Sequence, residues 1–247
     1  MKRVLKTAHR YYYLSLVAFF FILLYPFIYL FSRKPANLTA LNRLRRIFVF
    51  LSSSIGGIIN RYHFEESIDW SKTYIICPNH TSNLDINSAV LLIKRNYIFL
   101  GKDELLKNFV TRIYFETIDI PVNRESKMSS FRAFKRAEEY LKQGVSLVIF
   151  PEGLISDEYP PVLYPFKNGP FRLAIENNIP ILPVTFHNNW KMMWDDGRKY
   201  GSRPGVCDIY VHKPIETGHL TIDDTDALRE KVFAIIDQQF KKYENRA

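Results

Sequence analysis

The chain has 247 residues, of which 47% are hydrophobic and 24% are charged. These figures exclude a disordered or collagen-like chain, and two cysteines, Cys77 and Cys207, are too few for a disulfide scaffold. The net charge is +9, and residues 1–64 carry ten of the 34 Lys and Arg residues but none of the 25 Asp and Glu residues. A nucleic-acid-binding domain carries its basic residues on the folded surface. This distribution instead predicts a basic N-terminal segment that contacts anionic membrane phospholipid, and no nucleic-acid partner.

Residues 11–31 form an uncharged run of 21 residues that includes five Phe and five Tyr. A helix of about 20 apolar residues spans the hydrocarbon core of a bilayer. Tyr residues near both ends of the run resemble the aromatic belt of a membrane interface. A cleaved signal peptide would have a shorter apolar region ending in small residues, whereas this run ends in Tyr29, Leu30 and Phe31. The run therefore predicts a retained N-terminal membrane-binding helix.

A second uncharged run, residues 47–60, has only 14 residues and contains three serines and two glycines. It follows Arg43, Arg45 and Arg46, so it either lies in the membrane interface or packs as a helix on the folded domain. Because basic residues flank the first run on both sides, a hairpin that enters one leaflet fits the charge pattern better than a simple span. We expect residues 1–61 to form membrane-anchoring helices and residues 62–247 to form a separate folded domain.

From about residue 62, short apolar runs alternate with helical patterns. Buried strands are expected at residues 73–77, 97–100, 117–122, 146–150, 181–186 and 207–211. Helices are expected at residues 84–95, 103–114, 130–143, 171–177 and 224–242. This alternation predicts an α/β fold with a largely parallel or mixed sheet flanked by helices. In such sheets, functional loops gather at the carboxyl ends of the strands.

The first candidate for chemistry follows the first of these strands, where His80 is separated from Asp85 by four residues. If His80 lies in the turn and Asp85 in the first helical turn, the carboxylate accepts a hydrogen bond from one ring nitrogen. The other nitrogen is then available as a general base. The alternative is a capping box, in which Ser82 and Asp85 only stabilise the start of the helix.

Other charged residues and a glycine occupy loops at neighbouring strand ends or turns: Lys102, Arg124, Glu152 with Gly153, and Lys167. A guanidinium binds phosphate in a planar fork, and glycine allows a ligand to approach the backbone closely. A carboxylate such as Glu152 accepts hydrogen bonds from a polyhydroxyl substrate. Each position alone is typical of a solvated turn or surface residue, but together these loops favour one shared site.

Four motifs follow one another in a recognisable order: Asn79-His80 with Asp85, Arg124 at a strand end, Phe150-Pro151-Glu152-Gly153, and Ile181-Leu182-Pro183-Val184. In this order the chain resembles the glycerolipid acyltransferase family, above all the bacterial 1-acyl-glycerol-3-phosphate (lysophosphatidic acid) acyltransferases. The motifs cover residues 79–184, and the family's catalytic domain would cover residues 62–247. Two positions depart from the family pattern: Ile118, where the family often has Gly, and Leu154, where it usually has Thr or Ser.

The resemblance implies that His80 is the general base and that Asp85 orients it. It implies that the acceptor is held by Lys102, Arg124, Glu152, Gly153 and Lys167. The implied reaction moves a fatty acyl group from acyl-carrier protein or coenzyme A to lysophosphatidic acid, giving phosphatidic acid at the cytoplasmic face of the bacterial inner membrane. The chain has no Gly-x-Ser-x-Gly motif and no metal-ligand spacing, so we expect neither a covalent acyl-enzyme nor a metal or other cofactor.

Several alternatives remain open at the level of sequence. The acceptor could instead be glycerol 3-phosphate or a lyso-ornithine lipid. A lipid hydrolase would need a nucleophile such as Ser82, and a lipid-binding module would bind without turnover. The loop at residues 187–205, which contains Trp190 and Trp194, either enters the membrane interface or packs on the domain.

Overall fold

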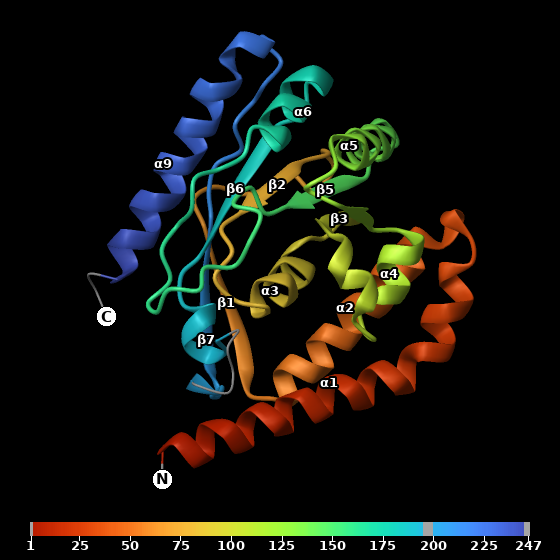
Figure 1. Cartoon of the computed structure of the whole chain (residues 1–247), viewed down its shortest axis with the longest axis vertical. Helices are drawn as coiled ribbons and strands as arrows, with labels where there is room; N and C mark the ends of the chain where they lie inside the picture. Colours follow the sequence, from red (N-terminus) through yellow and green to blue (C-terminus); the bar gives the residue numbers. More distant parts are fainter. Residues whose placement is uncertain (1, 195–199, 245–247) are drawn as a thin grey trace.

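The computed structural model describes residues 2–194 and 200–244, and it contains a sheet of seven strands in the order β1-β7-β6-β2-β5-β3-β4 (Figure 1). The strands are β1 (Ile58–Phe64), β2 (Ile75–Pro78), β3 (Tyr97–Lys102), β4 (Ile120–Val122), β5 (Ser146–Ile149), β6 (Ile181–Phe186) and β7 (Gly205–Val211). Strands β6, β2, β5, β3 and β4 are parallel, β7 is antiparallel to β6, and β1 is parallel to β7. The sheet is therefore mixed, and the expected α/β fold is confirmed.

Helices cover both faces of this sheet. They are α1 (Lys2–Ser32), α2 (Leu38–Ile55), α3 (Leu84–Leu92), α4 (Arg112–Thr117), α5 (Lys127–Lys142), α6 (Gly169–Asn177), α7 (Asn189–Met192) and α9 (Thr225–Glu244), with short 3₁₀ helices η1 (Pro35–Asn37), η2 (Asp103–Lys107) and η3 (Ile222–Asp224). Figure 1 shows α5, α6 and α9 on one face and α3, α2 and α1 on the other. Every residue of β2, β5 and β6 is buried, as expected for strands covered on both faces.

The prediction of one helix over residues 103–114 is wrong, because the structure has two shorter helices in this region. The structure instead has η2, a turn, and α4, which extends through Thr117 into the segment expected to be a strand. The side chain of Asn108 accepts hydrogen bonds from the amides of Val110 and Thr111, at 2.9 and 3.3 Å. A side-chain acceptor of this kind competes with the helical backbone and favours a turn, which explains the break.

The second uncharged run is divided between a helix and a strand. Helix α2 packs on the folded domain and ends at Ile55, with Gly56 as its C-cap. Gly57 has a φ of +70° that suits glycine at the following turn. Strand β1 then begins at Ile58 and pairs with β7. The sheet thus begins four residues before the boundary expected between residues 61 and 62.

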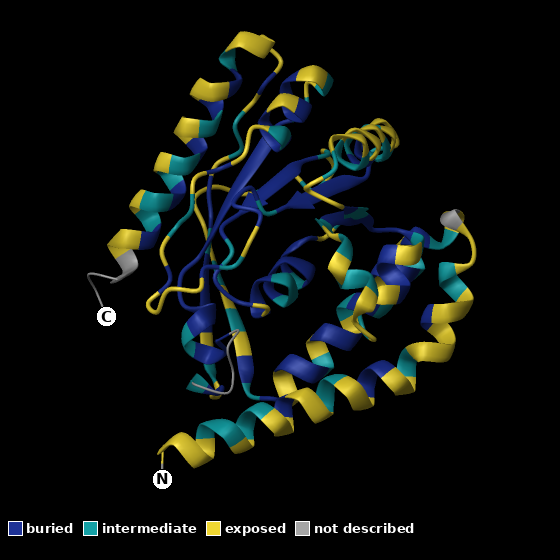
Figure 2. Cartoon of the chain, viewed as in Figure 1, coloured by how far each residue is buried: buried dark blue, intermediate teal, exposed yellow. Residues whose placement is uncertain are grey.

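Helix α1 lies against α2 and has 31 residues. It is the one helix in the described residues that is long and apolar enough to cross a membrane. Its buried residues form a single stripe, Tyr13, Phe20, Phe21 and Ile28, and most of its other side chains face outward (Figure 2). The spacing of seven or eight residues is typical of a helix that contacts its neighbour along one line.

The loop aromatics after β6 pack on the domain. Trp190 and Trp194 are 6% and 3% exposed, and both rings contact Tyr159 edge to face. Of the two alternatives for this loop, the structure favours packing over insertion into the interface for these two residues. Residues 195–199 of the same loop lie outside the described part of the chain.

Candidate active site

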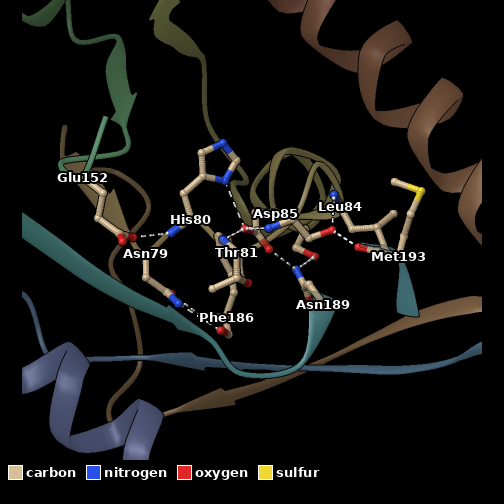
Figure 3. A network of polar contacts seen from close by, with 11 residues as sticks. Asn79, His80, Thr81, Leu84, Asp85, Glu152, Phe186, Asn189 and Met193 are labelled. Carbon is tan, nitrogen blue, oxygen red and sulfur yellow. Dashed lines mark hydrogen bonds and ion pairs between the residues drawn. The ribbon is translucent and has the colours of Figure 1, made fainter. Parts of the chain in front are cut away.

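His80 and Asp85 meet at the carboxyl end of β2 (Figure 3). Strand β2 ends at Pro78, a short turn carries His80, and Asp85 lies in the first turn of α3. The Nδ1 atom of His80 lies 3.0 Å from Oδ2 of Asp85. Because a carboxylate only accepts hydrogen bonds, Nδ1 is the nitrogen that carries hydrogen in the neutral ring, and Nε2 keeps its lone pair. This arrangement fits a general base with an orienting carboxylate.

The Asp85 carboxylate also holds the turn itself. Its Oδ2 atom accepts hydrogen bonds from the amides of Thr81 and Ser82, at 2.6 and 2.8 Å, and its Oδ1 atom accepts one from Asn189 at 2.8 Å. Asp85 is fully buried. The Asp85 carboxylate therefore has both of the roles considered for it. It stabilises the turn at the start of α3, and it also holds the His80 imidazole.

Ser82 is placed as a structural residue. Its side chain is fully buried, and its hydroxyl donates a hydrogen bond to the carbonyl of Met193 at 2.6 Å. The same oxygen accepts a hydrogen bond from the amide of Leu84 at 3.1 Å. A hydroxyl engaged in this way is not placed to attack a substrate, so the geometry gives no support to Ser82 as the nucleophile of a hydrolase.

The imidazole of His80 also has a fixed plane. The ring stacks on Phe150, with ring centroids 3.9 Å apart and an interplanar angle of 20°. The His80 side chain is 12% exposed. One face of the ring is therefore covered and Nδ1 is engaged, so the remaining reactive position is Nε2, which points away from Asp85 in Figure 3.

Glu152 contacts the turn that carries His80. Its Oε1 atom accepts a hydrogen bond from the amide of His80 at 2.7 Å, and its Oε2 atom accepts one from the amide of Tyr164 at 2.8 Å. Burial, which outweighs these two hydrogen bonds, raises the pKa of Glu152 to about 8. Both carboxyl oxygens are thus occupied by backbone, and Glu152 acts on the site through the position of His80.

Three cations gather beside this turn. A Cβ atom built on Gly153 would lie 3.1 Å from Nζ of Lys167 and 3.2 Å from Nη1 of Arg124. Gly153 also has a φ of +81°, so glycine is required there both for backbone conformation and for the approach of the two cations. Burial lowers the pKa of Lys167, and the positive charges of Arg124 and Lys102 lower it further. The structure therefore brings Lys102, Arg124 and Lys167 together, and such a grouping of cations is chemically suited to an anion.

Sequence reasoning missed two residues that hold this site. Asn79 pairs twice with the backbone of Phe186, donating to its carbonyl at 3.1 Å and accepting from its amide at 2.7 Å. Asn189 donates to Asp85 and, at 3.0 Å, to Ser88. Asn79 stands within the first motif, which was a usable signal. Asn189 is more than a hundred residues from Asp85, and nothing in the local pattern indicates the contact.

Comparison with known proteins gives consistent matches. The sequence model of the Acyltransferase family matches residues 60–187. The chain is 26% identical to the 1-acyl-sn-glycerol-3-phosphate acyltransferase alpha of Mus musculus, over 87% of this chain and 74% of that protein. It is 32% identical to a putative 1-acyl-sn-glycerol-3-phosphate acyltransferase of Caenorhabditis elegans, over 68% of this chain and 59% of that protein.

The fold has a counterpart among solved structures. The crystal structure of the 1-acyl-sn-glycerophosphate acyltransferase PlsC from Thermotoga maritima superimposes with a TM-score of 0.77, and the match covers 98% of each chain. The two sequences are 19% identical, so this likeness concerns the fold. The family match covers more than half of the chain and contains the His80–Asp85 pair, Arg124, Glu152 and Gly153. The chain therefore belongs to the acyltransferase family.

Proposed function

We propose that this protein transfers a fatty acyl group from an acyl thioester to the free hydroxyl of lysophosphatidic acid, forming phosphatidic acid. The observation that carries the proposal is the His80–Asp85 pair, 3.0 Å apart, beside the cluster of Lys102, Arg124 and Lys167. A base next to a phosphate-binding cluster suits an acceptor that carries a hydroxyl and a phosphate. The names of the curated relatives point to the same acceptor.

The reaction follows from this arrangement. Nε2 of His80 accepts the proton of the acceptor hydroxyl while the hydroxyl oxygen attacks the thioester carbonyl carbon. A C–O bond forms, the carbonyl oxygen becomes negative, and Asp85 stabilises the imidazolium. When the tetrahedral intermediate collapses, the C–S bond breaks and the thiolate takes the proton from His80. The thioester is already activated, so the sequence of steps needs no covalent acyl-enzyme and no cofactor.

Helix α1 supports a membrane location for this chemistry. Its outward residues include Leu23, Phe27 and Leu30, which are 55–63% exposed. Basic residues precede and follow the helix, where they can reach lipid phosphates. We propose that, of the α1–α2 hairpin, the outward side of α1 enters one leaflet of the membrane while α2 holds it on the domain, and that this placement presents the site to a lipid acceptor at the cytoplasmic face. The acyl donor, acyl-carrier protein or coenzyme A, then arrives from the aqueous side.

The test is transfer of a labelled acyl group from an acyl thioester to lysophosphatidic acid in lipid vesicles. Wild type should be active and His80→Ala should be inactive. By analogy with serine-protease triads, Asp85→Asn should cost about 10⁴-fold in kcat. Because Asp85 also accepts two backbone amides, thermal melting of each variant must be measured together with activity. If Asp85→Asn melts early but keeps near-normal specific activity, the carboxylate is structural only.

The acceptor is tested with the same assay. Glycerol 3-phosphate and a lyso-ornithine lipid are offered in place of lysophosphatidic acid, and we expect the highest kcat/KM with lysophosphatidic acid. A higher kcat/KM for either alternative acceptor would overturn lysophosphatidic acid as the acceptor, but it would leave the proposed acyl-transfer mechanism in place. Release of free fatty acid without any acceptor, or binding without turnover, would overturn the transferase itself.

A further inference from the structure

A second cationic pocket lies outside the site described above, between the edge strand β4 and the first turns of α5. Its volume is about 320 Å³. It is lined by Ile120, Pro121, Ser126, Ser129, Arg132, Ala133 and Arg136. None of these residues is acidic, and none was singled out by the sequence motifs. A hollow with two guanidinium groups and no carboxylate is suited to an anionic ligand.

The charges around this pocket are not neutralised by the fold. The first ten residues of α5 contain Lys127, Arg132, Lys135 and Arg136 but no Asp or Glu. Within the described part of the chain, Arg132 makes no hydrogen bond or ion pair. Arg136 donates one hydrogen bond, to the carbonyl of Thr117 at 2.9 Å. Guanidinium groups therefore line the pocket with most of their donors available.

The two serines add donors of fixed position. The oxygen of Ser126 accepts a hydrogen bond from the amide of Ser129 at 3.2 Å, and the oxygen of Ser129 accepts one from the amide of Asn123 at 3.0 Å. Each hydroxyl is thus held in place by an amide while its own hydrogen remains available to donate. Two guanidiniums and two oriented hydroxyls match the several acceptor oxygens of a phosphoryl group.

The residues that line this pocket lie close in sequence to Arg124 of the acceptor site, but the two sites are formed by different side chains. Arg124 reaches Gly153 and Lys167, whereas Ser126, two residues later, is the N-cap of α5 and lines the pocket. Under the proposed function both substrates carry phosphate: the lysophospholipid has one, and either thioester donor has a phosphopantetheine arm. Two phosphorylated substrates bound together are well served by two anion sites, and the fold has two cationic clusters that include residues close in sequence, Arg124 and Ser126.

We propose that the pocket formed by Arg132, Arg136, Ser126 and Ser129 binds a phosphoryl group of the acyl donor. This inference rests on the proposed function, because it assigns the second substrate of the same reaction. A phospholipid headgroup is the less suitable occupant. Figure 1 shows α1 at the bottom of the view and α5 at the upper right, with α4 and β3 between them, so α5 does not belong to the layer that faces lipid.

The experiment compares thioester donors with the same acyl chain: acyl-coenzyme A, acyl-3′-dephospho-coenzyme A, acyl-4′-phosphopantetheine, phosphate-free acyl-pantetheine, and acyl-carrier protein. Arg132→Gln is the test variant because Arg132 makes no hydrogen bond or ion pair with any described residue. Lys135→Gln is the matched control, since it removes one charge from the same helix without lining the pocket. Arg132→Gln should lower the ratio of kcat/KM between phosphorylated and phosphate-free donors by about 10-fold or more. Lys135→Gln should leave this ratio within about twofold.

The series also separates the sources of the phosphate. A loss confined to acyl-coenzyme A, absent with acyl-3′-dephospho-coenzyme A, identifies the 3′-phosphate. An equal loss with acyl-4′-phosphopantetheine and acyl-carrier protein identifies the phosphate of the arm. An unchanged ratio, a rise in KM for lysophosphatidic acid alone, or weaker binding to anionic phosphatidylglycerol vesicles with unchanged donor kinetics would each overturn the proposal.

Failure of the proposed function can be told apart from failure of the pocket. If wild type transfers nothing to any acceptor, the function is wrong, and the pocket is then tested by calorimetry with coenzyme A alone. The expected result is a Kd about 10-fold higher for Arg132→Gln than for wild type and Lys135→Gln. Equal Kd values for all three proteins would overturn the assignment of the pocket.

Discussion

Helices α1 and α2 look alike in sequence but differ in what they contact. Each combines a long uncharged run with basic residues, and the two pack against one another. Yet α1 buries only four residues, whereas α2, although shorter, buries eight: Leu38, Leu41, Asn42, Arg45, Phe48, Val49, Ser52 and Ser53. Three of the eight are spaced at i, i+3 and i+4 from Leu38 to Asn42, which is the pattern of a helix with one face in a core. The difference shows that apolar character alone does not decide which helix packs into the folded domain.

A buried charge explains the placement of α2. The Arg45 guanidinium pairs with Asp119 at 2.6 Å and lies 4.0 Å from the centre of the Tyr114 ring. The second carboxylate oxygen of Asp119 accepts a hydrogen bond from the backbone amide of Phe99 at 2.9 Å. An arginine that is 5% exposed cannot leave this pair without stranding the carboxylate. Helix α2 is therefore part of the folded domain, and α1 rests on it.

The largest expected effect comes from breaking this ion pair. Arg45→Met leaves the buried Asp119 carboxylate without its cation, so the free energy of unfolding should fall by about 3–5 kcal/mol. The measurement is urea unfolding in detergent micelles. The matched change just after α1, Arg33→Met, removes an exposed cation and should cost less than about 0.5 kcal/mol.

A second variant tests whether the loss of stability comes from the unpaired charge of Asp119. Adding Asp119→Asn to Arg45→Met removes the stranded charge while keeping an acceptor for the Phe99 amide, so part of the stability should return. If Arg45→Met stays within about 1 kcal/mol of wild type, the ion pair does not hold α2 on the domain.

Much of this architecture was predictable from local pattern, and the exceptions have physical causes. The strand–helix alternation and the His80–Asp85 pair depend on neighbours in sequence, and the structure has both. Strand β1 was missed because its first residues continue an uncharged run, and only its pairing with β7 makes it a strand. The roles of Arg45 and Glu152 depend on partners 74 and 72 residues away. No local spacing indicates such contacts.

Lowering the pH should reduce the stability of the folded domain without changing the proposed membrane contact of α1. Burial, against the charge of Glu65, lowers the pKa of His212 to about 4. The unfolded chain takes up this proton near pH 6.5 and the folded chain only near pH 4, so stability present above pH 6.5 is lost as the pH falls between these values. The loss should approach about 3 kcal/mol for this residue. Since the exposed side chains in the middle of α1 are apolar, vesicle binding through this helix should change little over the same range.

The check is urea unfolding at pH 7 and pH 5, with vesicle flotation at both values. His212→Gln keeps a hydrogen-bonding group near Thr185, whose hydroxyl lies 2.8 Å from Nε2 of His212, but removes the titration. This variant should show a shallower loss of stability with falling pH. An unchanged pH dependence would mean that His212 is not the titrating group.

Removing apolar surface from α1 should weaken vesicle binding and leave the stability of the folded domain unchanged. Leu23 and Leu30 are 56% and 63% exposed, and replacing both with Ser removes about 3 kcal/mol of apolar transfer energy if they lie in lipid. Vesicle affinity should fall about 100-fold, whereas the free energy of unfolding in detergent should stay within about 0.5 kcal/mol. Co-sedimentation with vesicles measures the first quantity. Unchanged vesicle affinity would show that this face of α1 does not enter the membrane.

The smallest expected effect concerns a hydrogen bond that joins α1 to α3, the helix of Asp85. The Tyr13 hydroxyl accepts a hydrogen bond from Asn87 at 2.7 Å, in a buried position. Tyr13→Phe leaves this amide without an acceptor and should cost about 1 kcal/mol of unfolding free energy. Tyr12→Phe is the adjacent control: its hydroxyl donates to the carbonyl of Ile55 at an exposed site, where water replaces it at little cost. Equal stability of the two variants in urea unfolding would mean that the Tyr13–Asn87 hydrogen bond does not help to hold α1 on the domain.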